Sequence, residues 1–132
     1  MKKVVTFGVF DYFHLGHLRL FEQARQYGDY LLVAVQEDEK ILEYKPTSTI
    51  FYSTEDRVHL IESLRPVDSV TTYRDVDVDI QHLDFDVFAV GEDQNHEGFQ
   101  RAIQWCHDHG KEVARLHYTK GISSTRVKQE LK

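Results

Sequence analysis

Short apolar runs alternate with longer amphipathic runs through almost the whole chain. The apolar runs predict strands at residues 3–8, 29–36, 69–73, 86–91 and 111–118. Helical spacing predicts helices at 15–27, 54–64, 97–110 and 125–132, with a loop and a short helix at 74–84. This order predicts a parallel sheet with helices on both faces, because parallel strands need a crossover between them. Right-handed crossovers then give a doubly wound, Rossmann-like α/β fold.

Nothing in the sequence divides the chain into two parts. Its 132 residues suit a single domain covering 1–132, and no repeat or Pro/Gly/Ser-rich linker interrupts them. Residues 37–53 have mixed character and contain Pro46, so they predict a long loop, a kind of segment that is often functional. Ser53 then predicts the N-cap of the helix at 54–64.

Charge and composition argue against several classes of function. The formal net charge is −6, whereas proteins that bind DNA or RNA usually carry a basic excess. No apolar run approaches the roughly 18 residues of a membrane span, and the N-terminus lacks the pattern of a signal peptide. The single cysteine, Cys106, predicts a packed, inert thiol on the inner face of a helix. We therefore expect a cytoplasmic protein with no nucleic-acid partner.

The first predicted helix begins without the acidic residue that usually complements its positive end. It has His14 and His17 instead, three residues apart and so on one helix face, with Gly16 between them. Unpaired backbone N–H groups, a glycine and two imidazoles together indicate a compact site for negative charge. Two alternatives stay open: surface histidines near a turn, and a metal pair completed by a carboxylate such as Asp11.

The last predicted helix shows a similar start. Ser123, Ser124 and Thr125 follow a glycine, and no acidic residue occupies the first turn. Hydroxyls and backbone N–H groups at a positive helix end can hold an anion, although ordinary N-capping would use the same residues. Ligands of doubly wound sheets bind beyond the carboxyl ends of the strands, where both helix starts are expected. Together they predict a site for one extended polyphosphate.

These residues also resemble a known family. HLGH (14–17) resembles the HxGH signature of the nucleotidyltransferase superfamily, and GISSTRVK (121–128) resembles its second, ISST-type signature. GDYLLVAVQEDE, LRPVD and DVFAVGED fit as well, so the similarity runs nearly from end to end. Among the branches, the sequence is most similar to the small bacterial glycerol-3-phosphate cytidylyltransferases.

The resemblance implies an activity. It implies transfer of CMP from CTP to glycerol-3-phosphate, or to a closely related small polyol phosphate, giving CDP-glycerol and pyrophosphate. It further implies Mg²⁺ that bridges phosphates rather than occupying a protein metal site, a homodimer, and a role in teichoic acid or capsular polymer synthesis. Two alternatives stay open: an adenylyltransferase acting on a sugar phosphate, and a non-catalytic nucleotide-binding module.

The resemblance also implies roles for individual residues. His14 and His17 would contact the phosphates and stabilise the transition state, and Lys45, Arg57 and Arg65 would contact substrate, with Arg65 the more direct participant of the two arginines. The remaining residues implied to bind the nucleotide are Val9, Phe10, Asp11, Gly16, Asp93, Lys120, Ser123, Ser124 and Thr125. Structural alternatives stay open for Lys45 as a solvated loop charge, Arg57 as the partner of an acid, Arg65 as the partner of Asp68, and Asp93 as a turn residue.

The sequence departs from the family pattern near the expected triphosphate and acceptor. Tyr118 stands where the family usually has an arginine, and Lys120 occupies the variable position that follows. A lysine is a point charge and cannot replace the bidentate guanidinium fully. These departures leave the class intact and leave the acceptor open between glycerol-3-phosphate, glycerol-2-phosphate and another alcohol phosphate.

Overall fold

The computed structural model describes residues 1–47 and 49–117. Within these residues five strands form one parallel sheet in the order β3-β2-β1-β4-β5. The strands are β1 (Lys3–Gly8), β2 (Tyr30–Gln36), β3 (Ser69–Tyr73), β4 (Val87–Gly91) and β5 (Glu112–Leu116). The strand order runs outward from β1 in both directions, so the doubly wound topology predicted from the sequence is confirmed.

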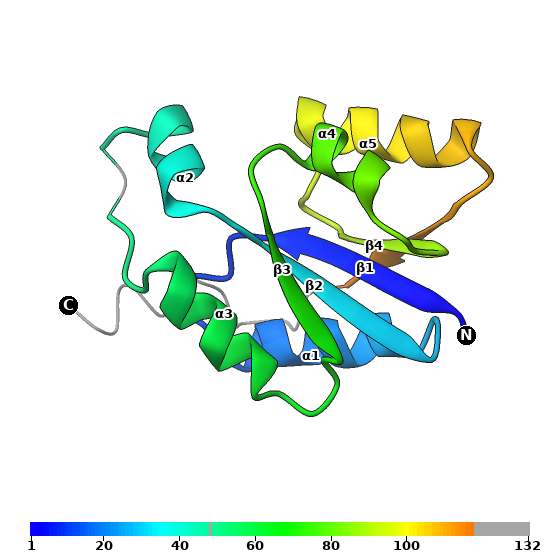
Figure 1. Cartoon of the computed structure of the whole chain (residues 1–132), viewed down its shortest axis with the longest axis horizontal. Helices are drawn as coiled ribbons and strands as arrows, with labels where there is room; N and C mark the ends of the chain where they lie inside the picture. The colour runs from blue at the N-terminus through cyan, green and yellow to red at the C-terminus, as the bar shows by residue number, and fades with distance from the viewer. Residues whose placement is uncertain (48, 118–132) are drawn as a thin grey trace.

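Helices cover both faces of the sheet. In Figure 1, α1 and α3 lie on one side of the strands, and α4 and α5 lie on the other. The helical segments are α1 (Leu15–Arg25), α2 (Asp38–Tyr44), α3 (Thr54–Glu62), α4 (Val76–Asp79), a 3-10 turn (Ile80–His82) and α5 (Glu97–Asp108). The helix predicted at 125–132 lies outside the described residues.

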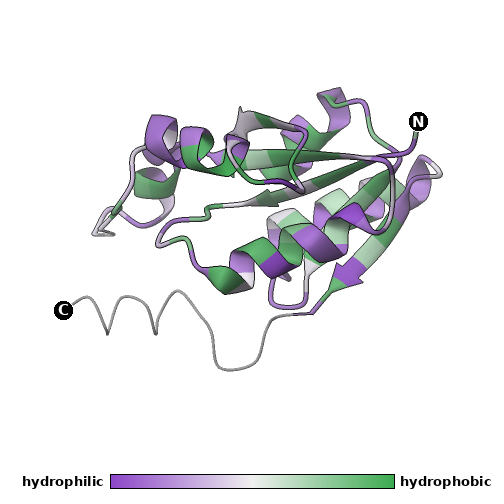
Figure 2. Ribbon diagram, turned by 90° about the horizontal axis from the view of Figure 1, so that it is seen from below, coloured by the Kyte–Doolittle hydropathy of each residue, from purple (hydrophilic) through white to green (hydrophobic). Residues whose placement is uncertain are grey.

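The apolar core has two layers because side chains alternate along each strand. Val4 of β1 packs in the layer beneath α1 and α3, whereas Val5 and Phe7 pack in the layer beneath α4 and α5. The strands are therefore mostly apolar, while the helices alternate between apolar and polar positions, as Figure 2 shows. This pattern is typical of parallel strands that are covered on both faces.

Element ends follow local signals. Ser53 caps α3, accepting a bond from the backbone N–H of Asp56 at 3.1 Å, as predicted. Gly110 follows α5 and has φ +71°, a conformation that glycine adopts without strain. Cys106 is buried on the inner face of α5, and burial raises the pKa of its thiol to about 11, so the prediction of a packed cysteine is confirmed.

The predicted loop at 37–53 is wrong in its first half. Residues Asp38–Tyr44 form α2, which leaves residues 45–53 as the connection to α3. Asp38 and Glu39 lie in the first turn of this helix, where acidic side chains complement the positive helix end. Ile41 is the buried residue of α2, so the helix shows no apolar stripe from which periodicity could have predicted it.

In the part of the chain that the structure describes, no helix is both long enough and apolar enough to cross a bilayer.

Candidate functional site

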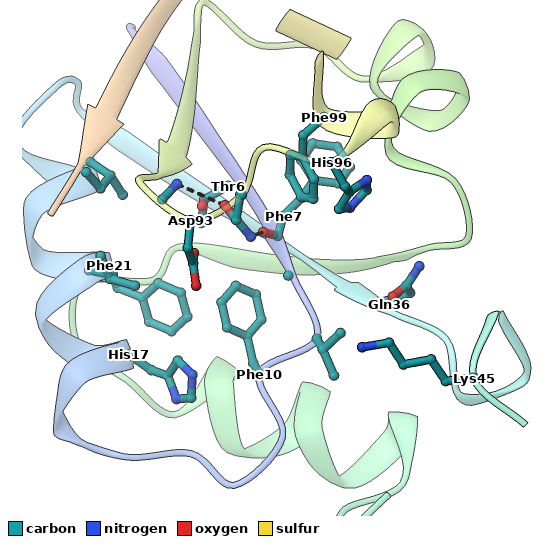
Figure 3. Close-up of a pocket in the computed structure, with 16 residues that line it drawn as sticks. Thr6, Phe7, Phe10, His17, Phe21, Gln36, Lys45, Asp93, His96 and Phe99 are labelled. Atoms are coloured by element: carbon teal, nitrogen blue, oxygen red, sulfur yellow. Dashed lines mark hydrogen bonds between the residues drawn. The ribbon is translucent and has the colours of Figure 1, made fainter. Parts of the chain in front are cut away.

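A cavity of about 410 Å³ opens at the carboxyl edge of the sheet, where the strand order reverses between β1 and β4. Its walls include Gly8 at the end of β1 and Gly91 at the end of β4. Figure 3 shows Phe10 near the middle of the cavity, with His17 on one side and Lys45 on the other. The cavity therefore lies at the edge where parallel doubly wound sheets bind ligands.

The turn between β1 and α1 has an unusual backbone. Phe10 has φ 56° and Tyr12 has φ 50°, values that residues other than glycine seldom adopt. The Phe10 ring lies directly over Gly8, where an added Cβ would come within 2.6 Å of its Cζ atom. Phe10 also contacts His17 and Phe21 edge-on, with ring centroids 5.8 Å and 5.1 Å away. Gly8 therefore lets the Phe10 ring fold back and support His17.

The two histidines form a capping box at the start of α1. The Nδ1 atom of His14 accepts a bond from the backbone N–H of Gly16 at 3.0 Å. In return, the backbone N–H of His14 donates to Nδ1 of His17 at 3.2 Å. The two rings stack with centroids 4.0 Å apart. Because each Nδ1 accepts a bond, each ring carries its proton on Nε2 and can donate from that atom.

Electrostatics keep His17 neutral. Burial, together with the neighbouring His14, lowers the pKa of His17 to about 3. Burial also lowers the pKa of His14. His17, which lines the cavity, therefore offers an anion a neutral hydrogen-bond donor, and His14 stacks against it. A neutral donor suits negative charge that increases during a reaction. The helix start predicted at residue 15 and its acid-free first turn are both confirmed.

Arg57 lies in the wall behind the cavity and does not line it. Its side chain is fully buried and donates to the carbonyl oxygens of Val9 at 2.7 Å and Tyr52 at 3.2 Å. It also donates to Thr54 Oγ1 at 3.3 Å and forms an ion pair with Asp38. Burial opposes ionisation of Asp38, but bonds from Thr54 and Arg57 outweigh it and lower its pKa. In this structure Arg57 thus holds the cavity wall in position, and the substrate contact implied for it stays a prediction.

Asp11 also holds the loop in place. Its two carboxylate oxygens accept bonds from the backbone N–H groups of Phe51 at 2.6 Å and Tyr52 at 2.9 Å. This side chain joins the β1–α1 turn to the segment before α3. In the structure it does not line the cavity. Asp11 therefore supports the backbone next to the cavity, and its implied place near the nucleotide stays a prediction.

Arg65 lies at the opposite edge of the sheet. It is exposed in the connection between α3 and β3, which leads into the amino end of a strand. The nearby Asp68 accepts a bond from the backbone N–H of Leu31 at the start of β2. Asp68 pairs with Arg25 at 3.2 Å. Within this chain Arg65 therefore lies away from the cavity, which is at the carboxyl ends of the strands, and the direct catalytic role implied for it stays a prediction.

Several other predicted residues do line the cavity. Val9, Phe10, His17, Lys45 and Asp93 all contribute to its walls. Gly16 is buried within the first turn of α1, beside the histidine box. Lys120, Ser123, Ser124 and Thr125 lie outside the described residues. The roles implied for all these residues stay predictions.

Three polar residues of the site were missed by the sequence analysis. Gln36 and His96 line the cavity, and Gln94 supports it. The Gln94 side chain accepts from the backbone N–H of Gly91 at 2.9 Å and donates to the carbonyl of Phe7 at 2.7 Å, joining β4 to β1. A signal for His96 was present, because His96–Gly98 repeats the His-x-Gly spacing of His14–Gly16.

A doubly wound parallel sheet, with paired histidines capping the helix after its first strand, defines the nucleotidyltransferase type of α/β fold. A family model described as cytidylyltransferase-like matches residues 5–130, and the chain belongs to this family.

Proteins with curated names show the same relationship. The glycerol-3-phosphate cytidylyltransferases of Staphylococcus aureus and Bacillus subtilis are each 38% identical to this chain, covering 99% of it and 96% and 98% of their own lengths. The FAD synthase of Thermococcus kodakarensis is 36% identical over 88% of this chain and 80% of its own length. A crystal structure of the lipopolysaccharide core biosynthesis protein from Thermoplasma volcanium has a TM-score of 0.73 at 24% identity, covering 92% of this chain and 99% of its own, and shows the shared fold.

Proposed function

We propose that this nucleotidyltransferase transfers CMP from CTP to glycerol-3-phosphate or a closely related small polyol phosphate. The observation that supports a nucleotidyl transfer is the histidine capping box at a helix N-terminus, in which His17 lines the cavity as a neutral donor. The choice of CTP and glycerol phosphate rests on the near full-length similarity to proteins named for that activity. The products are CDP-glycerol and pyrophosphate.

The reaction is a single displacement at phosphorus. An oxygen of the acceptor phosphate attacks the α-phosphorus of CTP and forms a new P–O bond. The bond from the α-phosphorus to the bridging oxygen breaks, and its electron pair leaves with pyrophosphate. Such a transfer needs mainly alignment and stabilisation of negative charge, and no covalent enzyme intermediate.

The described side chains divide these tasks between the two sides of the cavity. His17, supported by His14 and Phe10, donates from Nε2 to phosphate oxygens whose charge increases in the transition state. Lys45 brings a positive charge from the end of α2. We propose that Lys120, Ser123, Ser124 and Thr125 contact the β- and γ-phosphates, an assignment that rests on the family resemblance.

We propose Mg²⁺ as the cofactor, bound by phosphate oxygens and water. Among the described residues, no group of three or more His, Cys, Asp or Glu is placed to hold a metal ion. The proposal rests on the family resemblance and on the chemistry of Mg²⁺, which often keeps its waters and binds chiefly through substrate phosphates. When bound, the ion neutralises phosphate charge.

The proposal extends to the setting of the enzyme. We propose a homodimer in the cytoplasm that supplies CDP-glycerol for teichoic acid or capsular polymer synthesis. Light scattering coupled to size-exclusion chromatography tests the dimer, because a monomer of 15.5 kDa and its dimer are easily separated by mass.

Pyrophosphate release tests the activity itself. The purified protein is incubated with Mg²⁺ and CTP or ATP, against glycerol-3-phosphate, glycerol-2-phosphate, ribitol-5-phosphate, phosphoethanolamine and a heptose-1-phosphate. Release with CTP and a glycerol phosphate is the expected result. Release with ATP alone would instead favour adenylyl transfer, an alternative consistent with the similarity to FAD synthases. Nucleotide binding without any release would favour the non-catalytic module.

A further inference from the structure

Three polar side chains form a second corner of the cavity, which we call the Gln36 corner. Gln36 comes from the end of β2, Lys45 follows α2, and His96 precedes α5. In Figure 3, Gln36 and Lys45 lie across Phe10 from His17, and His96 lies toward the same side. The corner is therefore separate from the histidine box.

The His96 ring is held in one orientation. Its Nδ1 atom accepts a bond from the backbone N–H of Gly98 at 3.2 Å, so its proton lies on Nε2. The ring also contacts Phe99 edge-on, with centroids 4.7 Å apart. A Cβ on Gly98 would lie 3.1 Å from Cε1 of His96, so the glycine gives the ring its room. The bond to Gly98 thus leaves Nε2 of His96 as the donor, as the bond to Gly16 does for His14 on the other face of the sheet.

Gln36 can accept a hydrogen bond, whereas His96 can donate one. Its amide nitrogen donates to the carbonyl oxygen of Arg74 at 3.0 Å, which leaves the amide oxygen as the group that can accept a bond. A hydroxyl group both donates and accepts, so Gln36 and His96 together complement one hydroxyl. Lys45 adds a positive charge that suits a phosphate. The three side chains therefore match a phosphate with a hydroxyl on a nearby carbon.

We propose that the Gln36 corner binds the acceptor and that His96 selects acceptors with a hydroxyl near the phosphate. Lys45 attracts the acceptor phosphate, His96 donates from Nε2 to a hydroxyl oxygen, and the amide oxygen of Gln36 accepts a hydrogen bond from the same hydroxyl group. This inference rests on the proposed nucleotidyl transfer. It adds the specificity: a site that bonds a hydroxyl discriminates strongly against an analogue without one.

Steady-state kinetics with two acceptors test this assignment. Glycerol-3-phosphate and propyl phosphate share a phosphate on a three-carbon chain, but propyl phosphate lacks both hydroxyls. His96→Asn keeps a side-chain acceptor for the helix N-cap while removing the longer-reaching Nε2 donor. We expect His96→Asn to raise the KM for glycerol-3-phosphate roughly tenfold. The KM for CTP and the kcat/KM for propyl phosphate stay within about twofold of wild type.

Two further variants sharpen the result. Gly98→Ala crowds the His96 ring and is expected to produce a smaller change in the same direction. His107→Asn is the matched control, because His107 is an exposed histidine in the last turn of the same helix and does not line the cavity. It should leave both acceptors and CTP unchanged.

Each other outcome counts against the proposal. An equal loss with propyl phosphate would make His96 merely structural, and a higher KM for CTP would place it at the nucleotide. If the wild-type protein uses the two acceptors equally well, nucleotidyl transfer is supported. The proposal that the Gln36 corner binds a hydroxyl group is then wrong. If wild-type protein releases no pyrophosphate with any acceptor, the proposed function fails and this assignment fails with it.

Discussion

Two imidazoles at the start of α1 take the places that serine and glutamate occupy in a common capping box. His14 accepts from the N–H of Gly16, and His17 accepts from the N–H of His14. Each ring thereby satisfies a backbone donor with one nitrogen and keeps the other nitrogen as a donor. The cap thus sets the tautomer, and the tautomer makes the pair suitable for an anion.

His17→Ala removes the donor that lines the cavity. We expect kcat to fall by roughly 100- to 1,000-fold, because this group acts on charge that increases in the transition state. The loss of the cap acceptor should lower the free energy of unfolding by about 1 kcal/mol. Pyrophosphate release and urea denaturation of the same preparation measure the two effects. Near wild-type turnover in a folded variant would contradict the proposed role of His17.

The lowered pKa of His17 predicts a dependence of stability on pH. The unfolded histidine binds a proton near pH 6.5, whereas burial and His14 hold the pKa of the folded residue near 3. The stabilising contribution is therefore fully present above pH 6.5 and is lost as the pH falls from there toward 3. Between pH 7.5 and 4.5 the wild-type protein should lose about 2–3 kcal/mol more than His17→Gln.

His17→Gln is the control for this titration, since glutamine at the third helical position can keep the bond to the His14 N–H. Urea denaturation at several pH values gives the difference between the two proteins, in which the contributions of the carboxylates cancel. Parallel curves for the two proteins would show that His17 is not held neutral.

The sequence predicted part of this residue-level arrangement. The spacing of His14 and His17 and the missing acid predicted a cap and an anion site. It could not predict that Asp11 would bind two backbone N–H groups of a segment some 40 residues later, because that contact depends on how the loop folds back. The supporting role of Asp11 therefore had no signal in the sequence, and its implied place near the nucleotide stays a prediction.

At the scale of elements, one buried guanidinium joins three of them. Arg57 extends from α3 to the carbonyl of Val9 after β1 and to Asp38 at the start of α2. Because Lys45 follows α2 directly, Arg57 also fixes the element from which Lys45 reaches the cavity. A surface arginine would have no such effect, since exposed ion pairs contribute little to stability.

Arg57→Lys keeps the charge but cannot make the same set of bonds. We expect the free energy of unfolding to fall by about 2–4 kcal/mol, because buried acceptors lose their partner. Chemical denaturation measures this loss. The control is Arg65→Lys, which changes an exposed arginine at the other edge and should have little effect. Equal stability of the two variants would contradict the joining role of Arg57.

The elements themselves were largely predictable, and the exceptions have physical reasons. Strands that are apolar on both faces, such as residues 30–36, leave a strong signal of a central parallel strand. Helix α2 left almost no helix signal in the sequence, because contacts of charged side chains rather than an apolar stripe hold it against the rest of the protein. Arg74 pairs with Glu37 and Glu43, and Tyr44 donates to Asp75. Such contacts join residues some 30 positions apart, so they cannot be seen in a local sequence window.

At the scale of the whole molecule, the two edges of the sheet have different tasks. The carboxyl edge holds the cavity, while the amino edge holds supporting contacts such as Asp68 with Arg25 and the Leu31 N–H. The predicted topology already indicated which segments lie at which edge, because a connection from a helix to the next strand, such as residues 63–68, leads to the amino end of that strand. The family resemblance implies a direct role for Arg65, whereas the topology places this residue at the amino edge, where the structure also has it.

Comparison of Lys45→Ala with Arg65→Ala tests this division. Lys45 lines the cavity, so its loss should raise the KM of a phosphate substrate at least tenfold by removing a charged contact. Arg65 lies in the α3–β3 connection, so its loss should leave kcat and both KM values within about twofold. Steady-state rates with CTP and glycerol-3-phosphate measure both variants, and urea denaturation confirms that each is folded. A large loss of kcat in Arg65→Ala would contradict this division, because within one chain Arg65 lies at the edge of the sheet opposite the cavity. It would mean that Arg65 of a second chain completes the site.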